Sequence, residues 1–299
     1  MSLRSAILML HRVVPEAELE TRLLQKPDFE ISVEFFNKYL FRLRDSYRFV
    51  SLDNLYSRLK HSSSSPIREP LLAVTFDDGY TDVLTHALPI LEKYQIPFTI
   101  YLTTGYPDKR IIHISAAIED WVRQASHIDL RVKSKVLSYD LTTLSQKSQA
   151  FQAIETALFT TYNTIEEIMN ILPVNVAPYR SLGLNWEQVK ELSENPLCTI
   201  GAHTITHPDL TMLSSVDLSR ELLISKQRIE FYLKMGVRHF AYPYGRYNCS
   251  VVSMAEAAGY ETMCTTMETS LSLDNIDFSR LPRACVVQNK FQIFSGSAL

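Results

Sequence analysis

The segment Leu71-Leu72-Ala73-Val74-Thr75-Phe76-Asp77-Asp78-Gly79 is a short apolar run that ends in two adjacent carboxylates and a glycine. A second apolar run, Cys198-Thr199-Ile200-Gly201-Ala202, is followed directly by His203-Thr204-Ile205-Thr206-His207. Short apolar runs with β-branched residues predict strands. Each of these two predicted strands therefore ends at side chains of the types that bind metals and transfer protons.

Similar runs recur along the whole chain and alternate with helical patterns. Strands are expected at 6–10, 48–51, 71–76, 97–102, 198–202, 238–242, 261–265 and 283–287. Helical spacing of apolar residues separates the later runs, as in 217–233 and 251–258, so parallel strands joined by crossover helices are predicted. Seven or eight such units predict an α/β fold, a TIM-barrel-like (β/α) barrel with its chemistry at the C-terminal ends of the strands.

The stretch from about 106 to 184 departs from this alternation. It holds helical segments at 116–124 and 148–159 without the spacing of further strands, so we interpret it as a mainly helical insertion that caps the mouth of the barrel. With 299 residues and 46% hydrophobic content, the chain can bury a sizeable core. We therefore expect one domain over 1–299.

Composition excludes several classes of partner. A net charge of -3 and a pI near 6.3 give no basic excess for binding nucleic acid. No stretch approaches the ~18–20 apolar residues of a membrane span, and the apolar run 6–10 is too short for a signal peptide. A cytoplasmic location is expected. The four cysteines are widely spaced, which favours buried free thiols over disulfides or a zinc knuckle.

Polar residues gather where the expected strands end. His11, Asp77, Asp78, His203, His207, Tyr244 and Arg283 all fall at a strand end or in the adjoining loop. Two imidazoles and one carboxylate suit a divalent metal, and the other carboxylate remains for proton transfer, a combination that predicts metal-assisted hydrolysis. Each motif alone has a plainer explanation, since Asp-Asp-Gly and Pro243-Tyr244-Gly245 are typical of turns. Their joint occurrence at strand ends favours the active site.

Three ordered motifs carry a family resemblance. Thr75-Phe76-Asp77-Asp78-Gly79, Gly201 to Pro208 and Phe240-Ala241-Tyr242-Pro243-Tyr244-Gly245 resemble motifs of the polysaccharide deacetylase family, carbohydrate esterase family 4. Leu10-His11-Arg12-Val13 and Leu281-Pro282-Arg283 are similar to a subgroup of it. The resemblance implies a distorted (β/α) barrel and a metal-dependent deacetylase acting on N-acetylated amino sugars.

The resemblance also implies roles for individual residues. Asp77 resembles the general base, Asp78 the carboxylate ligand, and His203 and His207 the imidazole ligands of the metal. Tyr244 occupies the place of a backbone N–H that stabilises the oxyanion. Tyr242, Pro243 and Tyr244 are expected to bind substrate. Zinc is the expected metal, with cobalt, manganese and nickel as alternatives.

The chain departs from the family pattern in two places. Ala241 stands where many members carry an arginine that orients the base, and we expect Arg283 to take over this role within hydrogen-bonding reach of Asp77. The late leucine-any-histidine motif that supplies a general acid is absent, which leaves His11 as the best candidate. Two other functions stay open. One is hydrolysis of another linear amide, such as a lipid-linked formamido sugar, and the other is carbohydrate binding without catalysis.

Overall fold

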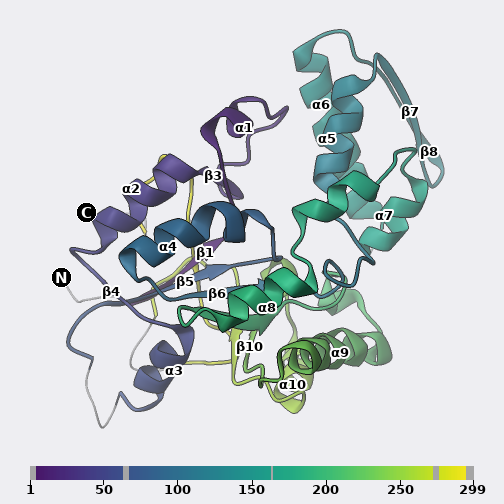
Figure 1. The fold of residues 1–299 in the computed structure, drawn as a ribbon. Coiled ribbons are helices and arrows are strands. Elements are labelled where there is room, and N and C mark those ends of the chain that lie inside the picture. The colour runs from purple at the N-terminus through teal and green to yellow at the C-terminus, as the bar shows by residue number, and fades with distance from the viewer. Residues whose placement is uncertain (1–4, 63–66, 163, 272–275, 294–299) are drawn as a thin grey trace.

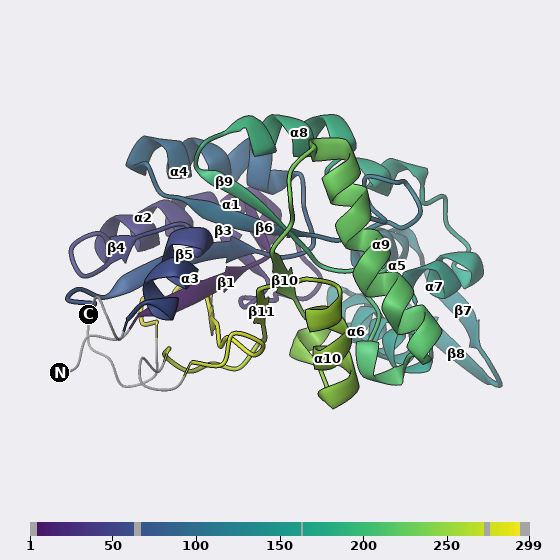
Figure 2. The same ribbon diagram turned by 90° about the horizontal axis from the view of Figure 1, so that it is seen from below.

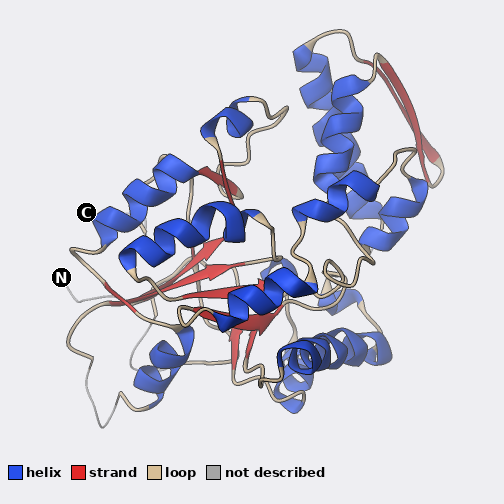
Figure 3. Cartoon of the chain, viewed as in Figure 1, coloured by secondary structure: helices blue, strands red, loops and turns tan. Residues whose placement is uncertain are grey.

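The computed structural model describes residues 5–62, 67–162, 164–271 and 276–293. Within these ranges, eight strands form one sheet in which every pairing is parallel, with the order β11-β10-β9-β6-β5-β1-β12 and with β4 paired to β5 (Figures 1 and 3). The strands are β1 (Ala6–Leu10), β4 (Arg48–Phe49), β5 (Leu71–Phe76), β6 (Phe98–Leu102), β9 (Cys198–Ala202), β10 (His239–Ala241), β11 (Thr262–Cys264) and β12 (Ala284–Cys285). All eight predicted strands are confirmed.

The two ends of the sheet are linked by the segment that leads into β12. Cys264 of β11 forms a parallel bridge with Leu281, and the Leu281 N–H donates to the carbonyl of Met263 at 2.8 Å. The chain then continues into β12, which pairs with β1. This link curls the sheet into a distorted barrel, as predicted.

Helices surround the outside of the sheet (Figure 2). They are α2 (Val33–Leu43), α3 (Leu52–Lys60), α4 (Leu88–Tyr94), α8 (Trp186–Glu194), α9 (Ser215–Leu233) and α10 (Cys249–Ala257). Most begin at a Ser or Asn whose side chain accepts a hydrogen bond from the first turn, which is the usual N-cap. A short connection after β1 holds α1 (Glu16–Glu20) and the parallel pair β2 (Arg12–Val14) and β3 (Glu30–Ser32). No helix in the described ranges is long and apolar enough to cross a membrane.

The insertion projects from the barrel (Figures 1 and 3). Its elements are α5 (Ile114–Gln124), β7 (His127–Val132), β8 (Lys135–Asp140), α6 (Leu144–Thr161), α7 (Ile165–Ile171) and the short helix η2 (Ala177–Leu182). A separate hydrophobic cluster holds them together and includes Ile118, Leu130, Phe151 and Leu158. The expected helical segments are present.

Two sequence expectations need correction. The antiparallel hairpin β7–β8 was not expected, although Ile128, Leu130 and Val132 are buried and alternate with exposed residues, which is the period of a strand. The four cysteines are free, as predicted, but only Cys264 is fully buried and Cys249 is exposed. Cys249 is the first residue of α10, and its side chain is exposed to solvent.

Candidate active site

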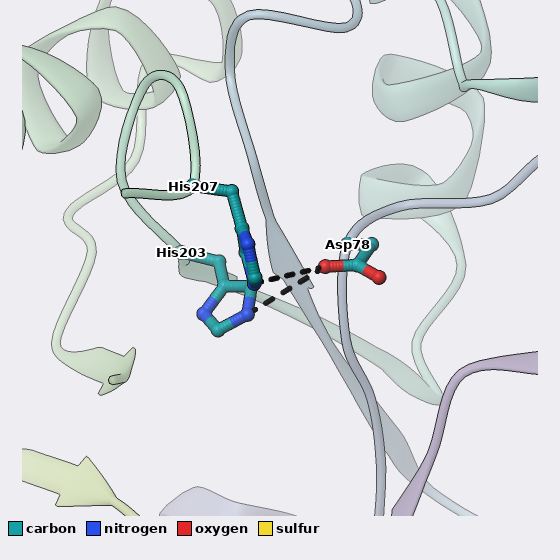
Figure 4. Close-up of side chains that lie close together, drawn as sticks. All are labelled: Asp78, His203 and His207. Carbon is teal, nitrogen blue, oxygen red and sulfur yellow. Dashed lines mark ion pairs between the residues drawn. The ribbon is translucent and has the colours of Figure 1, made fainter. Parts of the chain in front are cut away.

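Asp78, His203 and His207 come together at the C-terminal ends of β5 and β9, which are separated in the sheet only by β6. Asp78 Oδ1 lies 3.7 Å from His203 Nε2 and 3.5 Å from His207 Nε2 (Figure 4). One potential ligand atom from each residue lies within 4.8 Å of the others. Ligands about 2.0–2.2 Å from a tetrahedral zinc ion lie roughly 3.3–3.6 Å apart. The three residues thus fit a divalent metal site.

The loop conformations after the strands turn these side chains towards one another. Asp78 has φ 71° and His207 has φ 55°, both in the left-handed region that non-glycine residues seldom adopt. The turn at Asp78 separates the directions of two adjacent carboxylates, so that Asp78 faces the imidazoles and Asp77 faces the barrel interior. Such strain is typical of functional sites.

Glu221 of α9 fixes the loop that carries the two histidines. Its carboxylate accepts hydrogen bonds from the Ile205 N–H at 2.7 Å and from the N–H and hydroxyl of Thr206 at 3.1 and 2.7 Å. The His207 N–H donates to the hydroxyl oxygen of Thr204 at 3.0 Å. Glu221 was not among the predicted site residues, because a single glutamate within an amphipathic helix gives no local signal of this contact.

Both imidazoles are held neutral. His203 Nδ1 lies 2.7 Å from the carbonyl oxygen of Ala241, which can only accept, so Nδ1 carries the proton and Nε2 keeps its lone pair towards Asp78. Burial lowers the pKa of His203 and of His207 to about 4. Metal binding requires neutral imidazole, so both the tautomer and the pKa favour it at neutral pH.

Asp77 forms a paired salt bridge with Arg283. The guanidinium donates to Asp77 Oδ1 at 2.6 Å and to Oδ2 at 2.7 Å, and Arg283 is completely buried. It also donates to the carbonyl oxygen of Thr265 and to the hydroxyl of Thr75. Burial raises the pKa of Asp77, but the charge and hydrogen bonds of Arg283 outweigh it and hold the pKa well below the ordinary value. The contact expected between Arg283 and Asp77 is therefore present.

His11 follows β1 beside this pair. The N–H of Asp77 donates to the carbonyl of Leu10 at 2.9 Å, which places His11 next to Asp77 across the two strands. The His11 ring packs against Phe29 at 4.7 Å between centroids. Its Nδ1 is buried and has no hydrogen-bond partner in the part of the chain that the structure describes. The structure thus adds an uncommitted ring nitrogen at the site.

The third motif divides into a buried and an exposed part. Tyr244 is 47% exposed, and its ring lies edge-on to that of His207, with the centroids 4.6 Å apart. Tyr242 is completely buried, and its hydroxyl donates to the carbonyl of Ser279 at 3.0 Å. The expectation that Tyr242 binds substrate is wrong, because its ring belongs to the barrel core. Pro243 is buried as well, so Tyr244 is the residue of the three that solvent reaches.

Two further polar residues near the site, His113 and Arg12, were not among the predicted site residues. His113 is stacked between Tyr80 and Tyr106, with centroid distances of 3.5 and 3.8 Å, and burial lowers its pKa well below the usual range. Arg12 Nε donates to Asp82 at 2.7 Å and a terminal nitrogen of Arg12 donates to Glu30. The contact with Asp82 holds the connection after β1 against the segment after β5, and the contact with Glu30 lies within that connection.

The chain belongs to the polysaccharide deacetylase family, whose sequence model matches residues 64–263. This range includes Asp77, Asp78, His203, His207 and Tyr244, whereas His11 and Arg283 lie outside it. A curated relative, the putative polysaccharide deacetylase YxkH of Bacillus subtilis (strain 168), is 24% identical over 206 residues. The match covers 69% of this chain and 48% of YxkH, so the chain spans about half the length of that relative.

Solved structures show the same fold. The Streptococcus pyogenes deacetylase PplD in complex with acetate matches with a TM-score of 0.63 and 21% identity, covering 96% of this chain and 93% of that one. A de-N-acetylase from Aggregatibacter actinomycetemcomitans matches with a TM-score of 0.61 and 15% identity, covering 95% of each chain. At these identities the likeness establishes the barrel fold alone.

Proposed function

We propose that this protein is a metal-dependent hydrolase that removes the acetyl group from an N-acetylated amino sugar. The observation that carries the proposal is the separation of two adjacent carboxylates into two chemical roles. Asp78 faces two neutral imidazoles in a ligand set, while Asp77 is paired with Arg283 and stays ionised. The position of this pair of sites in a polysaccharide deacetylase barrel supports the same reaction.

Each residue of the site has a separate role in amide hydrolysis. A divalent ion held by Asp78, His203 and His207, with zinc as the expected metal, would supply Lewis acidity to the acetyl carbonyl and to water. Asp77 takes the proton of the attacking water, and Arg283 holds its carboxylate in one orientation. The Tyr244 N–H donates to the oxyanion, which is worth roughly 3–4 kcal/mol at such a position. His11, whose Nδ1 has no hydrogen-bond partner among the described residues, protonates the leaving amine.

A substrate panel tests this function against the alternatives. Matched N-acetyl, N-formyl and O-acetyl amino sugars are incubated with the zinc-loaded protein, and released acetate or formate is measured. We expect acetate release from the N-acetyl sugars to exceed release from the other two classes. Faster release of formate would favour a deformylase, and binding of sugars without any release would favour a carbohydrate-binding barrel.

The Asp77–Arg283 pair yields a prediction on pH dependence. Arg283→Lys keeps the charge but loses the planar fork, so kcat should fall by about 10–10²-fold while the metal content stays the same. A weaker partner lets the pKa of Asp77 rise towards its ordinary value, and a base works only when deprotonated. The acidic limb of kcat/KM should therefore move to higher pH.

Arg280→Lys is the matched control for this measurement. Arg280 lies on the same segment and pairs with Asp277, but its side chain is 50% exposed. It should leave both kcat and the pH profile unchanged. An Arg283→Lys protein with the wild-type profile would show that Arg283 does not position the base.

A further inference from the structure

The side of α9 that faces away from the barrel exposes a row of apolar side chains. The buried residues of this 19-residue helix are Leu218, Leu222, Ser225 and Ile229. At helical spacing, the opposite side of the helix, which we call the outer face of α9, consists of Val216, Arg220, Leu223, Ile224, Gln227, Phe231 and Lys234. Four of these seven residues are apolar, whereas the solvent side of a surface helix is normally polar and charged.

The apolar residues of the outer face have no cover. Val216 and Phe231 are 78% and 63% exposed, and Leu223 and Ile224 are exposed as well. Figure 2 shows α9 along the outside of the barrel with no other element drawn across it. A single exposed apolar residue needs no explanation, but a row of them along one helix indicates a surface that binds something.

Two cations lie among these apolar side chains. Arg220 is exposed and makes no ion pair with any residue that the structure describes. Lys234 is exposed too, and its Nζ lies 4.3 Å from the centre of the Phe231 ring. The outer face therefore combines aliphatic and aromatic groups with positive charge, which is the composition of helices that lie on anionic membranes.

The acidic residues of α9 are already engaged within the protein. Asp217 accepts from the Ser214 hydroxyl at 2.7 Å at the start of the helix. Glu221 binds the loop of the two histidines. Glu230 pairs with Lys226 at 3.3 Å and accepts from the Val237 N–H at 3.0 Å. None of these carboxylates forms an ion pair with Arg220 or Lys234 in the described part of the chain.

A second copy of the chain fits this face poorly. Two outer faces packed together would place cations against cations, with no carboxylate on either face to compensate. A helix of this length presents a strip roughly 28 Å long and 10 Å wide, which is small beside the ~800 Å² that each partner of a stable dimer buries. A membrane surface instead offers lipid phosphates for the cations and an acyl boundary for the apolar groups.

We propose that the outer face of α9 binds the surface of an anionic lipid membrane. Val216, Leu223, Ile224 and Phe231 enter the boundary between headgroups and acyl chains, and the two cations contact lipid phosphates. Glu221, in the second turn of α9, contacts the loop that carries the two histidines. Docking through α9 thus holds the candidate metal site close to the membrane surface.

Vesicle flotation of the full chain tests the proposal. Vesicles of phosphatidylcholine alone are compared with vesicles of equal parts phosphatidylcholine and phosphatidylglycerol. We expect the partition coefficient on the anionic vesicles to be at least about tenfold higher, and to fall when sodium chloride is raised from ~0.1 M to ~0.5 M. The net charge of the chain is -3, so binding to an anionic surface requires a local basic site.

Two double variants test the two components of the face. Val216→Ser/Phe231→Ser removes exposed apolar groups and should lower the partition coefficient on anionic vesicles about tenfold or more. Arg220→Gln/Lys234→Gln should lower it by roughly 10–30-fold, to the level on phosphatidylcholine. All four positions are exposed, and circular dichroism checks that each variant is folded.

Lys38→Gln/Phe41→Ser is the matched control. It removes one cation and one exposed aromatic ring from α2, which lies on the other side of the barrel from α9 in Figures 1 and 2. It should partition like the wild-type protein. The assay needs neither metal nor substrate, so its result is independent of the proposed hydrolysis.

Three results would overturn the proposal. One is partitioning that is no stronger on anionic than on neutral vesicles, and another is partitioning that neither α9 variant reduces. The third is a dimer, detected by sedimentation without vesicles, that Val216→Ser/Phe231→Ser dissociates, because a second copy would then cover the outer face. Binding that both α9 variants weaken and the α2 control leaves unchanged would support it.

Discussion

His203→Ala and His207→Ala proteins should lose the bound divalent metal and acetate release together. Each substitution removes one of the three side chains that converge within 4.8 Å, and two remaining ligands hold an ion poorly. Because the metal is expected to contribute several kcal/mol of transition-state stabilisation, kcat/KM should fall by at least about 10³-fold. Metal content after dialysis and acetate release are measured on the same preparations.

His127→Ala is the control for this pair of variants. His127 lies on the β7–β8 hairpin, where its side chain is 49% exposed and pairs with Asp129 and Asp140. It should retain full metal content and activity. Circular dichroism establishes that each variant is folded, and His207→Ala is the more informative variant because His207 is less buried than His203. Stoichiometric metal in both ligand variants would contradict the assignment.

Asp77→Asn should separate metal binding from proton transfer. The amide has the shape of the carboxylate but cannot accept the proton of water, so kcat should fall about 10²–10⁴-fold while the metal content stays at the wild-type level. The substitution also leaves the buried Arg283 charge without its counter-charge, which should lower the free energy of unfolding by about 3–5 kcal/mol. Thermal unfolding is therefore recorded together with activity.

Asp277→Asn provides the matched control for the loss of an ion pair. Asp277 pairs with Arg280 at the surface, where its side chain is 44% exposed, and such pairs contribute about 0–1 kcal/mol. It should change neither activity nor stability to a comparable degree. Near-wild-type acetate release from Asp77→Asn would place the general base elsewhere.

The sequence predicted the barrel and the residues that meet at its mouth because both depend on strand ends. A polar residue that directly follows a buried parallel strand lies at the C-terminal edge of the sheet, whichever helix comes next. Asp78 follows β5 and His203 follows β9, so the two residues meet at that edge. The contact of Arg283 with Asp77 was predictable from a missing partner, since a buried carboxylate at such a site requires a cation and Ala241 cannot supply one.

Other features depend on tertiary placement and had no local signal. Tyr242 follows β10 in a motif that also contains the exposed Tyr244. Only its complete burial and the hydrogen bonds of its hydroxyl to Met263 Sδ and the Ser279 carbonyl assign it to the core. The contact of Glu221 with the histidine loop joins residues 15 and 16 positions apart across a turn. The β7–β8 hairpin, by contrast, had a local signal, because polar and apolar residues alternate from 127 to 132.

If one metal ion at Asp78, His203 and His207 carries the hydrolysis, acetate release should follow the stepwise addition of metal. Metal-free protein is titrated with zinc while acetate release from an N-acetylated amino sugar is followed. We expect negligible release at the start, a linear rise to one equivalent of zinc and a plateau beyond it. Full release from the metal-free protein, or release that does not follow zinc binding, would show that the hydrolysis does not depend on this ion.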